Sequence, residues 1–170
     1  MIKIYNRLSR SASSRAAFCF EYLYFYAMEY SKTIEVRWAD LDPNFHVLHS
    51  KYYDYGAYVR MCYLTENGIT PEALNNFHIG PIIFREECIF RREIKFGDVV
   101  KITLSLGKAR KDVSRWTMKH DLILNGHTVA AQITVDGAWM DTVSRKLATP
   151  PESFIQSFNK IPKALDFEWI

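Results

Sequence analysis

Residues 51–66 are the part of the sequence that most limits how the chain can fold. They contain only four charged side chains, and tyrosine or aliphatic residues occupy most of the other positions. A segment of this length and composition predicts a helix that is buried on most sides. Ser50 stands where an N-cap is expected, and Asn67 followed by Gly68 suits the end of the helix. Such a helix needs other secondary structure wrapped around it.

The covering structure is predicted to be a sheet, because the apolar pattern elsewhere has a period of two. The segments that alternate in this way are 32–38 before the helix and 81–98, 99–112, 113–124 and 127–141 after it. Asn125 and Gly126 give a hairpin signal, and 96–98 indicate a bend or bulge. Short helices are expected at 70–77 and 149–158. The order predicts one α+β domain in which an antiparallel sheet curves around the long helix.

The distribution of charge argues against nucleic acid as a partner. The net charge of +3 comes entirely from residues 1–27, and the rest of the chain holds equal numbers of acidic and basic groups. We expect residues 1–27 to be upstream sequence or a peripheral extension, with translation starting at Met28. The folded domain is expected over residues 28–160, followed by a loose C-terminal tail over 161–170.

Cysteine usage and hydropathy bear on the compartment. The three cysteines stand far apart and form no CxxC pair, which is typical of reduced thiols in the cytoplasm. No uncharged apolar run is long enough to cross a bilayer. We therefore expect a cytoplasmic protein without a membrane span.

Four polar side chains, Asp40, Asp42, His46 and His49, precede the long helix. In extended backbone the two aspartates would share a side, and the pKa of one of two close carboxyls is raised. The alternative for Asp42, which precedes a proline, is an ordinary turn. A metal site is not expected, because no third histidine or cysteine lies near the two histidines. The amides of residues 49–52 would lie at the positive end of the helix, which stabilises an oxyanion.

These groups together suit the hydrolysis of a carbonyl compound, and the sequence around them resembles a known family. "RWADLDPNFHVLHSKYYDYGAYVR", followed by "FGDVVKIT" and the expected hairpin sheet, resembles the hotdog-fold acyl-CoA thioesterases over residues 30–158. Within that fold it is similar to the 4-hydroxybenzoyl-CoA thioesterase group. The resemblance implies that Asp42 is the catalytic carboxylate and that the main-chain amide of His49 polarises the thioester carbonyl. This chain departs from the pattern, because it reads "FHVLHSKY" where the family often has a glycine or an HVN-type sequence.

The resulting expectation is an enzyme that hydrolyses acyl-CoA thioesters without a cofactor or a metal. Asp42 would attack the carbonyl or activate a water, and the His49 side chain would orient Asp42 or assist departure of the thiolate. The further candidates for contact with the substrate are His46, Ser50, Tyr52 and Tyr53. For the tyrosines, burial in the core is the simpler role.

CoA carries phosphates, so a basic rim is expected beside the site. The two candidate groups are Arg91, Arg92 and Lys95, or Lys108, Arg110 and Lys111; either could instead be an ordinary solvated strand edge. The resemblance also implies a homodimer or homotetramer, because the family's sites form between subunits. Two other functions stay open on the same fold: a non-catalytic acyl-CoA-binding module and, less favoured, a hydroxyacyl thioester dehydratase. The segment "NFHVLHS" lacks the "HFPG"-like pattern of the dehydratases.

Overall fold

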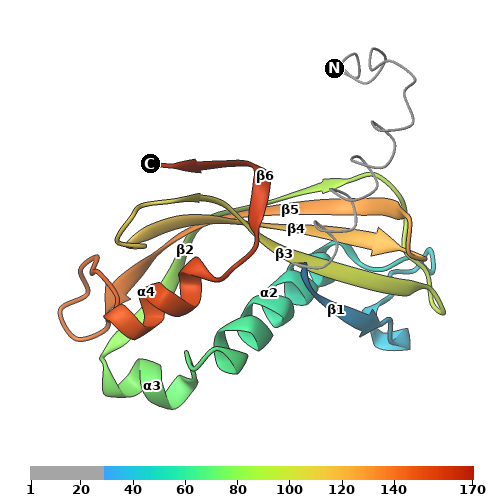
Figure 1. The fold of residues 1–170 in the computed structure, drawn as a ribbon. Helices are drawn as coiled ribbons and strands as arrows, with labels where there is room; N and C mark the ends of the chain where they lie inside the picture. Colours follow the sequence, from blue (N-terminus) through green and yellow to red (C-terminus); the bar gives the residue numbers. More distant parts are fainter. Residues whose placement is uncertain (1–28) are drawn as a thin grey trace, which may run out of the picture.

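The computed structural model describes residues 29–170 (Figure 1). The expectations for residues 1–27 and for Met28 lie outside the described residues. The strands are β1 (Tyr30–Glu35), β2 (Ile79–Phe90), β3 (Val99–Ala109), β4 (Arg115–Leu124), β5 (Thr128–Asp141) and β6 (Lys163–Trp169). The helices are the 3-10 helix η1 (Trp38–Asp40), α2 (His49–Glu66), α3 (Pro71–Asn76) and α4 (Glu152–Asn159).

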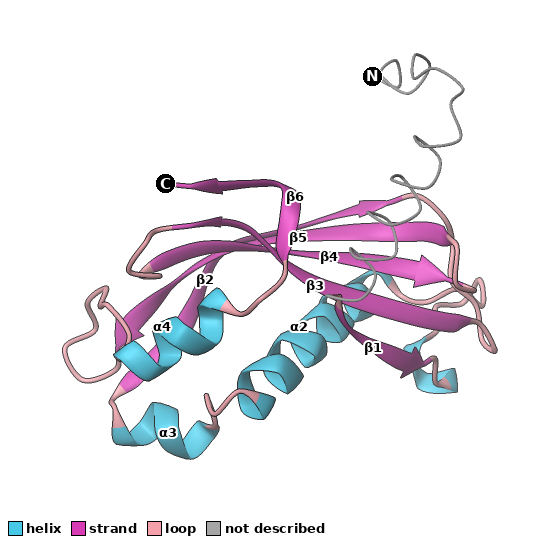
Figure 2. Ribbon diagram, viewed as in Figure 1, coloured by secondary structure: helices cyan, strands magenta, loops and turns pink. Residues whose placement is uncertain are grey.

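The strands form one six-stranded sheet in the order β1-β3-β4-β5-β2, and β6 also pairs with β3. Neighbouring strands are antiparallel except for β6, which runs parallel to β3. Figure 2 shows the sheet curving over α2, with α3 and α4 gathered near one end. This arrangement confirms the expected α+β hotdog architecture, a curved sheet around a long helix.

Helix α2 turns one face towards the sheet. The buried residues on that face recur every three or four positions: Tyr52, Tyr55, Val59 and Tyr63. Gly56 also lies there, where an added Cβ atom would approach within 3.1 Å of the Ile133 side chain. The opposite face is open, since Tyr58 is 52% and Met61 41% exposed. The prediction of a helix buried on most sides is therefore wrong, because the sheet covers only one side of it.

The start of α2 also differs from the expectation. Leu48 is the N-cap residue, with no hydrogen bond from its side chain, and the helix begins at the next residue. The Val47 N–H donates to the Ile94 carbonyl at 2.8 Å, and the Leu48 N–H donates to the Asp40 carbonyl at 2.8 Å. These two bonds tie down the chain just before the helix, so Ser50 lies within the first turn and is not the cap.

Two segments near the ends of the described chain depart from prediction. Trp38, expected at the end of strand 32–38, lies in η1 and is 68% exposed. Residues 163–169, expected in a loose tail, form β6. The cause is a free stretch of the β3 edge beyond β1, where the Leu106 N–H donates to the Pro162 carbonyl at 2.8 Å.

The expected turns are confirmed at several positions. Thr70 caps α3 through its side chain, and Gly68 follows α2 with a φ of 82°. Asn125 and Gly126, with φ values of 50° and 84°, turn the chain between β4 and β5. Gly97, with a φ of 85°, lies in a turn between β2 and β3 rather than within a strand. Within residues 29–170, none of the helices combines the length and apolar character that a bilayer crossing requires.

Candidate active site at the start of helix α2

The turn that leads into α2 is built around Asp42. Its Oδ1 accepts hydrogen bonds from the main-chain amides of Asn44 at 2.8 Å and His46 at 3.1 Å. The Asp42 N–H in turn donates to the His46 carbonyl at 2.7 Å. Phe45 takes the left-handed backbone conformation, with a φ of 62°. The turn that was the alternative for Asp42 is thus present, and it leaves Oδ2 without a hydrogen bond from any described residue.

Asp40 has a different environment. Its fully buried carboxylate accepts from the Arg37 guanidinium at 2.9 and 3.1 Å and from the Tyr55 hydroxyl at 3.1 Å. The hydrogen bonds from Arg37 hold the pKa of the Asp40 carboxyl at about 2, against the opposing effect of burial. The expected pair of close carboxylates with one raised pKa is therefore wrong. Asp40 joins the turn to α2, and Asp42 alone faces the site.

A hollow of about 340 Å³ opens between the start of α2 and the end of β2. Its lining residues are Asp42, His46, Val47, His49, Tyr52, Phe90, Arg91, Arg92 and Glu93. The rings of Tyr52 and Phe90 meet edge to face at 4.9 Å between centroids and form one wall. Four of the predicted site residues, Asp42, His46, His49 and Tyr52, thus come together. Ser50 and Tyr53 are not among the lining residues.

The first turn of α2 presents free amide groups beside this pocket. The Lys51 N–H donates to the Leu48 carbonyl at 2.8 Å. The N–H groups of His49 and Ser50 make no hydrogen bond with a described residue. They lie at the positive end of an 18-residue helix, where an anion or a developing oxyanion is stabilised.

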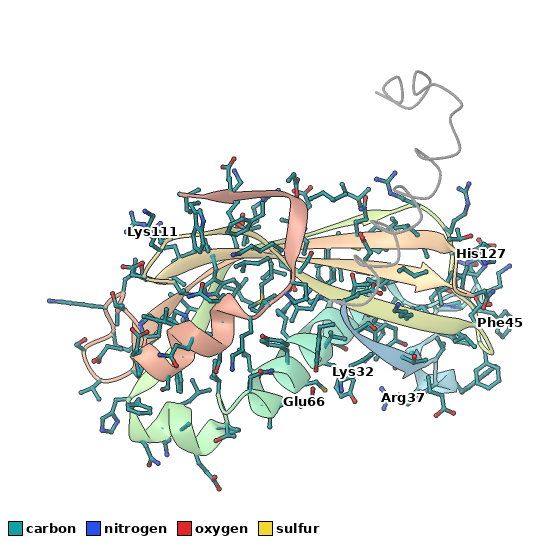
Figure 3. All side chains as sticks on the ribbon, in the orientation of Figure 1. Lys32, Arg37, Phe45, Glu66, Lys111 and His127 are labelled. Carbon is teal, nitrogen blue, oxygen red and sulfur yellow. The ribbon has the colours of Figure 1, made fainter. Side chains whose placement is uncertain are left out.

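Of the two basic groups considered from the sequence, Arg91 and Arg92 contribute to the pocket wall. Arg91 donates to the Gln132 side chain and Arg92 to the Arg91 carbonyl, and neither forms an ion pair with a described carboxylate. Figure 3 shows Arg37 and Phe45 at one end of the molecule and Lys111 at the other. The group around Lys111 therefore lies away from the site.

Phe90 and Glu93 were not foreseen as site residues. Phe90 is the last residue of β2 and Glu93 lies just after the strand; both are far from Asp42 in the sequence, and no local motif marks them. A backbone bridge between His46 and Lys95 brings that segment beside the Asp42 turn. Only this long-range pairing could have identified them. No group of three or more histidine, cysteine or acidic side chains in residues 29–170 is arranged to hold a metal ion.

Comparison with solved structures shows the same fold in several proteins. A Staphylococcus aureus protein, solved in complex with CoA, superposes with a TM-score of 0.75 at 19% identity, over 81% of this chain and 87% of that one. A DHNA-CoA thioesterase from Staphylococcus aureus superposes with a TM-score of 0.70 at 15% identity, over 78% of this chain and 89% of that one. A 1,4-dihydroxy-2-naphthoyl-CoA thioesterase from Synechocystis superposes with a TM-score of 0.70 at 13% identity, over 77% of this chain and 96% of that one. A search against curated proteins found no match.

The sequence also matches a family model. The model describes the thioesterase-like superfamily and aligns with residues 36–158, which include the Asp42 turn, α2 and β2 to β5. The match spans well over half of the 170 residues. It confirms the resemblance inferred from the sequence, and it supports thioester hydrolysis as the general chemistry. The chain therefore belongs to the thioesterase-like superfamily.

Proposed function

We propose that this protein hydrolyses acyl-CoA thioesters in the pocket at the start of α2. The proposal depends chiefly on one observation. Asp42, whose Oδ2 has no hydrogen bond with a described residue, stands at the same turn-to-helix junction as the free N–H groups of His49 and Ser50. Asp42 and His49 also line the same pocket. Hydrolysis of a thioester needs a base or nucleophile on one side of the carbonyl carbon. It also needs donors for the carbonyl oxygen, which becomes negative in the transition state.

In this mechanism the thioester oxygen accepts from the His49 amide at the positive end of α2. Asp42 Oδ2 removes a proton from a water that attacks the carbonyl carbon, or attacks that carbon itself. The hydrogen bonds to Oδ1 hold the carboxylate still, so that Oδ2 keeps its direction. In this proposal the imidazole of His49, which is exposed at the rim, orients Asp42.

The choice of CoA as the carrier is supported by the charges of the pocket. Arg91 and Arg92 line it without a carboxylate partner, and guanidinium groups are well suited to phosphates. The Staphylococcus aureus protein of similar fold was solved with CoA bound. We extend the proposal to a cytoplasmic homo-oligomer, a dimer or a tetramer, for which β2 offers an open sheet edge.

The test is a free-thiol release assay with short, long and aromatic acyl-CoAs. We expect wild-type protein to release CoA, and Asp42→Asn to lower kcat by about 10²-fold or more. Asp166→Asn is the matched control, because Asp166 lies on β6 and pairs with Lys119 at 2.5 Å. Its rate should equal that of wild type.

Two results would contradict the proposal. Undiminished thiol release by Asp42→Asn would remove that residue from the chemistry. Acyl-CoA that binds to wild type but is never hydrolysed would show a non-catalytic acyl-CoA-binding module instead.

A further inference from the structure

Glu93 and His46 form a contact inside the pocket. His46 Nε2 lies 3.4 Å from Glu93 Oε2. The other oxygen of Glu93, Oε1, lies 2.8 Å from Lys95 Nζ. Both oxygens of Glu93 therefore face a nitrogen. The His46 side chain is about one-third exposed, at 32%, so solvent and substrate reach it.

The relative position of these two residues is set by main-chain pairing. An isolated antiparallel bridge joins His46 to Lys95, and the Val47 N–H donates to the Ile94 carbonyl at 2.8 Å. Glu93 thus stands next to a segment that is tied to the Asp42 turn. Because the backbone already brings the two residues together, little side-chain entropy is lost when the imidazole is held beside the carboxylate.

The orientation of the imidazole leaves one nitrogen available. Nε2 faces Glu93, and Nδ1 has no hydrogen bond with a described residue. A carboxylate beside an imidazole fixes the direction of the ring, as the orienting acid does for a catalytic histidine. The other ionisable groups that line this pocket are Asp42, His49, Tyr52, Arg91 and Arg92. Of the two acids in that lining, Glu93 contacts the His46 imidazole, whereas Asp42 bonds to the His46 main chain.

We propose that Glu93 is a positioning residue that holds His46 as the proton donor for the departing thiol; this rests on the proposed function. Asp42 Oδ2 takes one proton from water, and the hydroxide oxygen bonds to the carbonyl carbon. As the carbon–sulfur bond breaks, its electron pair stays on sulfur and the Nδ1 proton of the imidazolium passes to that sulfur. The proton on Asp42 returns to the imidazole through solvent, so acid and free thiol are the products.

The test compares two esters of the same acyl group: the CoA thioester and a thiophenyl ester. An aryl thiolate is a stable anion and leaves without a proton, whereas the alkyl thiolate of CoA gains from one. We expect Glu93→Gln to lower kcat for the CoA ester by about tenfold to 10²-fold, with KM unchanged, and for the thiophenyl ester by less than about threefold. His46→Gln should give the same contrast. Glu72→Gln, at an exposed site on α3, is the matched control and should change neither rate.

An equal loss with both esters, or no loss with either, would overturn the inference while leaving the proposed hydrolysis intact. Absence of wild-type turnover with both esters would instead contradict the proposed function, and this inference would fall with it. Thermal melts of both variants check that each is folded. Glu93 is 54% exposed, so its replacement by an uncharged side chain of the same shape leaves the core untouched.

Discussion

Asp40 and Asp42 stand two positions apart, yet their carboxylates have opposite roles. Asp40 is buried and neutralised by Arg37, whereas Asp42 is held by main-chain amides at the pocket. The turn at Asp42 could be predicted, because an aspartate before proline often hydrogen-bonds to amides just ahead of it. The burial of Asp40 could not be predicted, since it depends on how α2 packs against the turn and brings the Tyr55 hydroxyl to the carboxylate.

Replacement of Asp40 should destabilise the fold in a pH-dependent way. The folded pKa of about 2 lies below the ordinary value of 3.8, so the ionised carboxylate stabilises the fold fully above about pH 4. That contribution is lost as the pH falls from 4 to 2. We expect Asp40→Asn to lower the free energy of unfolding by about 1–3 kcal/mol at pH 7, with the difference from wild type shrinking below pH 4.

Urea denaturation between pH 7 and pH 3 measures this difference. Asp54→Asn is the control, because Asp54 is exposed and its pair with Lys51 should contribute little. A difference between wild type and Asp40→Asn that stayed constant with pH would show that the charge of Asp40 is not what stabilises the turn.

Helix α2 carries one buried charge on its sheet-facing side. Arg60 Nη2 lies 3.0 Å from Glu86 Oε1 on β2, and Nη1 lies 3.3 Å from His120 Nε2 on β4. His120 Nδ1 is 2.8 Å from the Thr103 carbonyl, so Nδ1 is the donor there and Nε2 accepts from Arg60. Burial first, and then the guanidinium, lower the pKa of His120 to about 3 and keep it neutral. The periodicity of α2 predicts the position of Arg60 on this face but not its partners.

Breaking this pair from one side should be costly. Arg60→Met leaves Glu86 without its cation, and we expect a loss of about 3 kcal/mol in the free energy of unfolding. The double variant Arg60→Met/Glu86→Leu should recover most of that loss, because no uncompensated charge is left. Equilibrium denaturation of wild type, Arg60→Met, Glu86→Leu and the double variant gives the coupling energy between the two side chains. The same double-variant cycle on the more exposed ion pair between Lys32 and Glu66 should give a coupling energy of less than about 1 kcal/mol. If the losses in free energy of unfolding caused by the two single variants simply added in the double variant, Arg60 and Glu86 would not stabilise the fold as a pair.

At the scale of the whole molecule, β2 forms one edge of the described sheet and carries exposed apolar side chains. Ile83 and Ile89 are 49% and 48% exposed. The sequence of β2 is self-complementary about Glu86, because Arg85 and Glu87, of opposite charge, flank it and the two isoleucines lie three positions away on either side. A second copy, antiparallel across a two-fold axis at Glu86, would therefore set Arg85 of each copy opposite Glu87 of the other and cover apolar surface, while Glu86, which pairs with Arg60, would lie on the axis.

This symmetry leads to a prediction about assembly. Wild type should elute as a dimer or a tetramer of the 19.9 kDa chain. Arg85→Glu should shift it towards monomer, because like charges then meet across the axis. The double reversal Arg85→Glu/Glu87→Arg should restore the oligomer. Size-exclusion chromatography with light scattering measures the mass. A wild-type monomer, or an oligomer that Arg85→Glu leaves unchanged, would show that this edge is not the interface.

By itself, the sequence determined the long helix, the hairpin, the Asp42 turn and the closeness of Asp42 to His49. These features depend on interactions within a few residues of one another, which periodicity and turn chemistry report directly. Tertiary structure decided the open face of α2, the strand β6, the burial of Asp40 and the contact between His46 and Glu93. Each of these depends on how segments that are separated in the sequence pack against one another, and that packing leaves no mark on the local sequence.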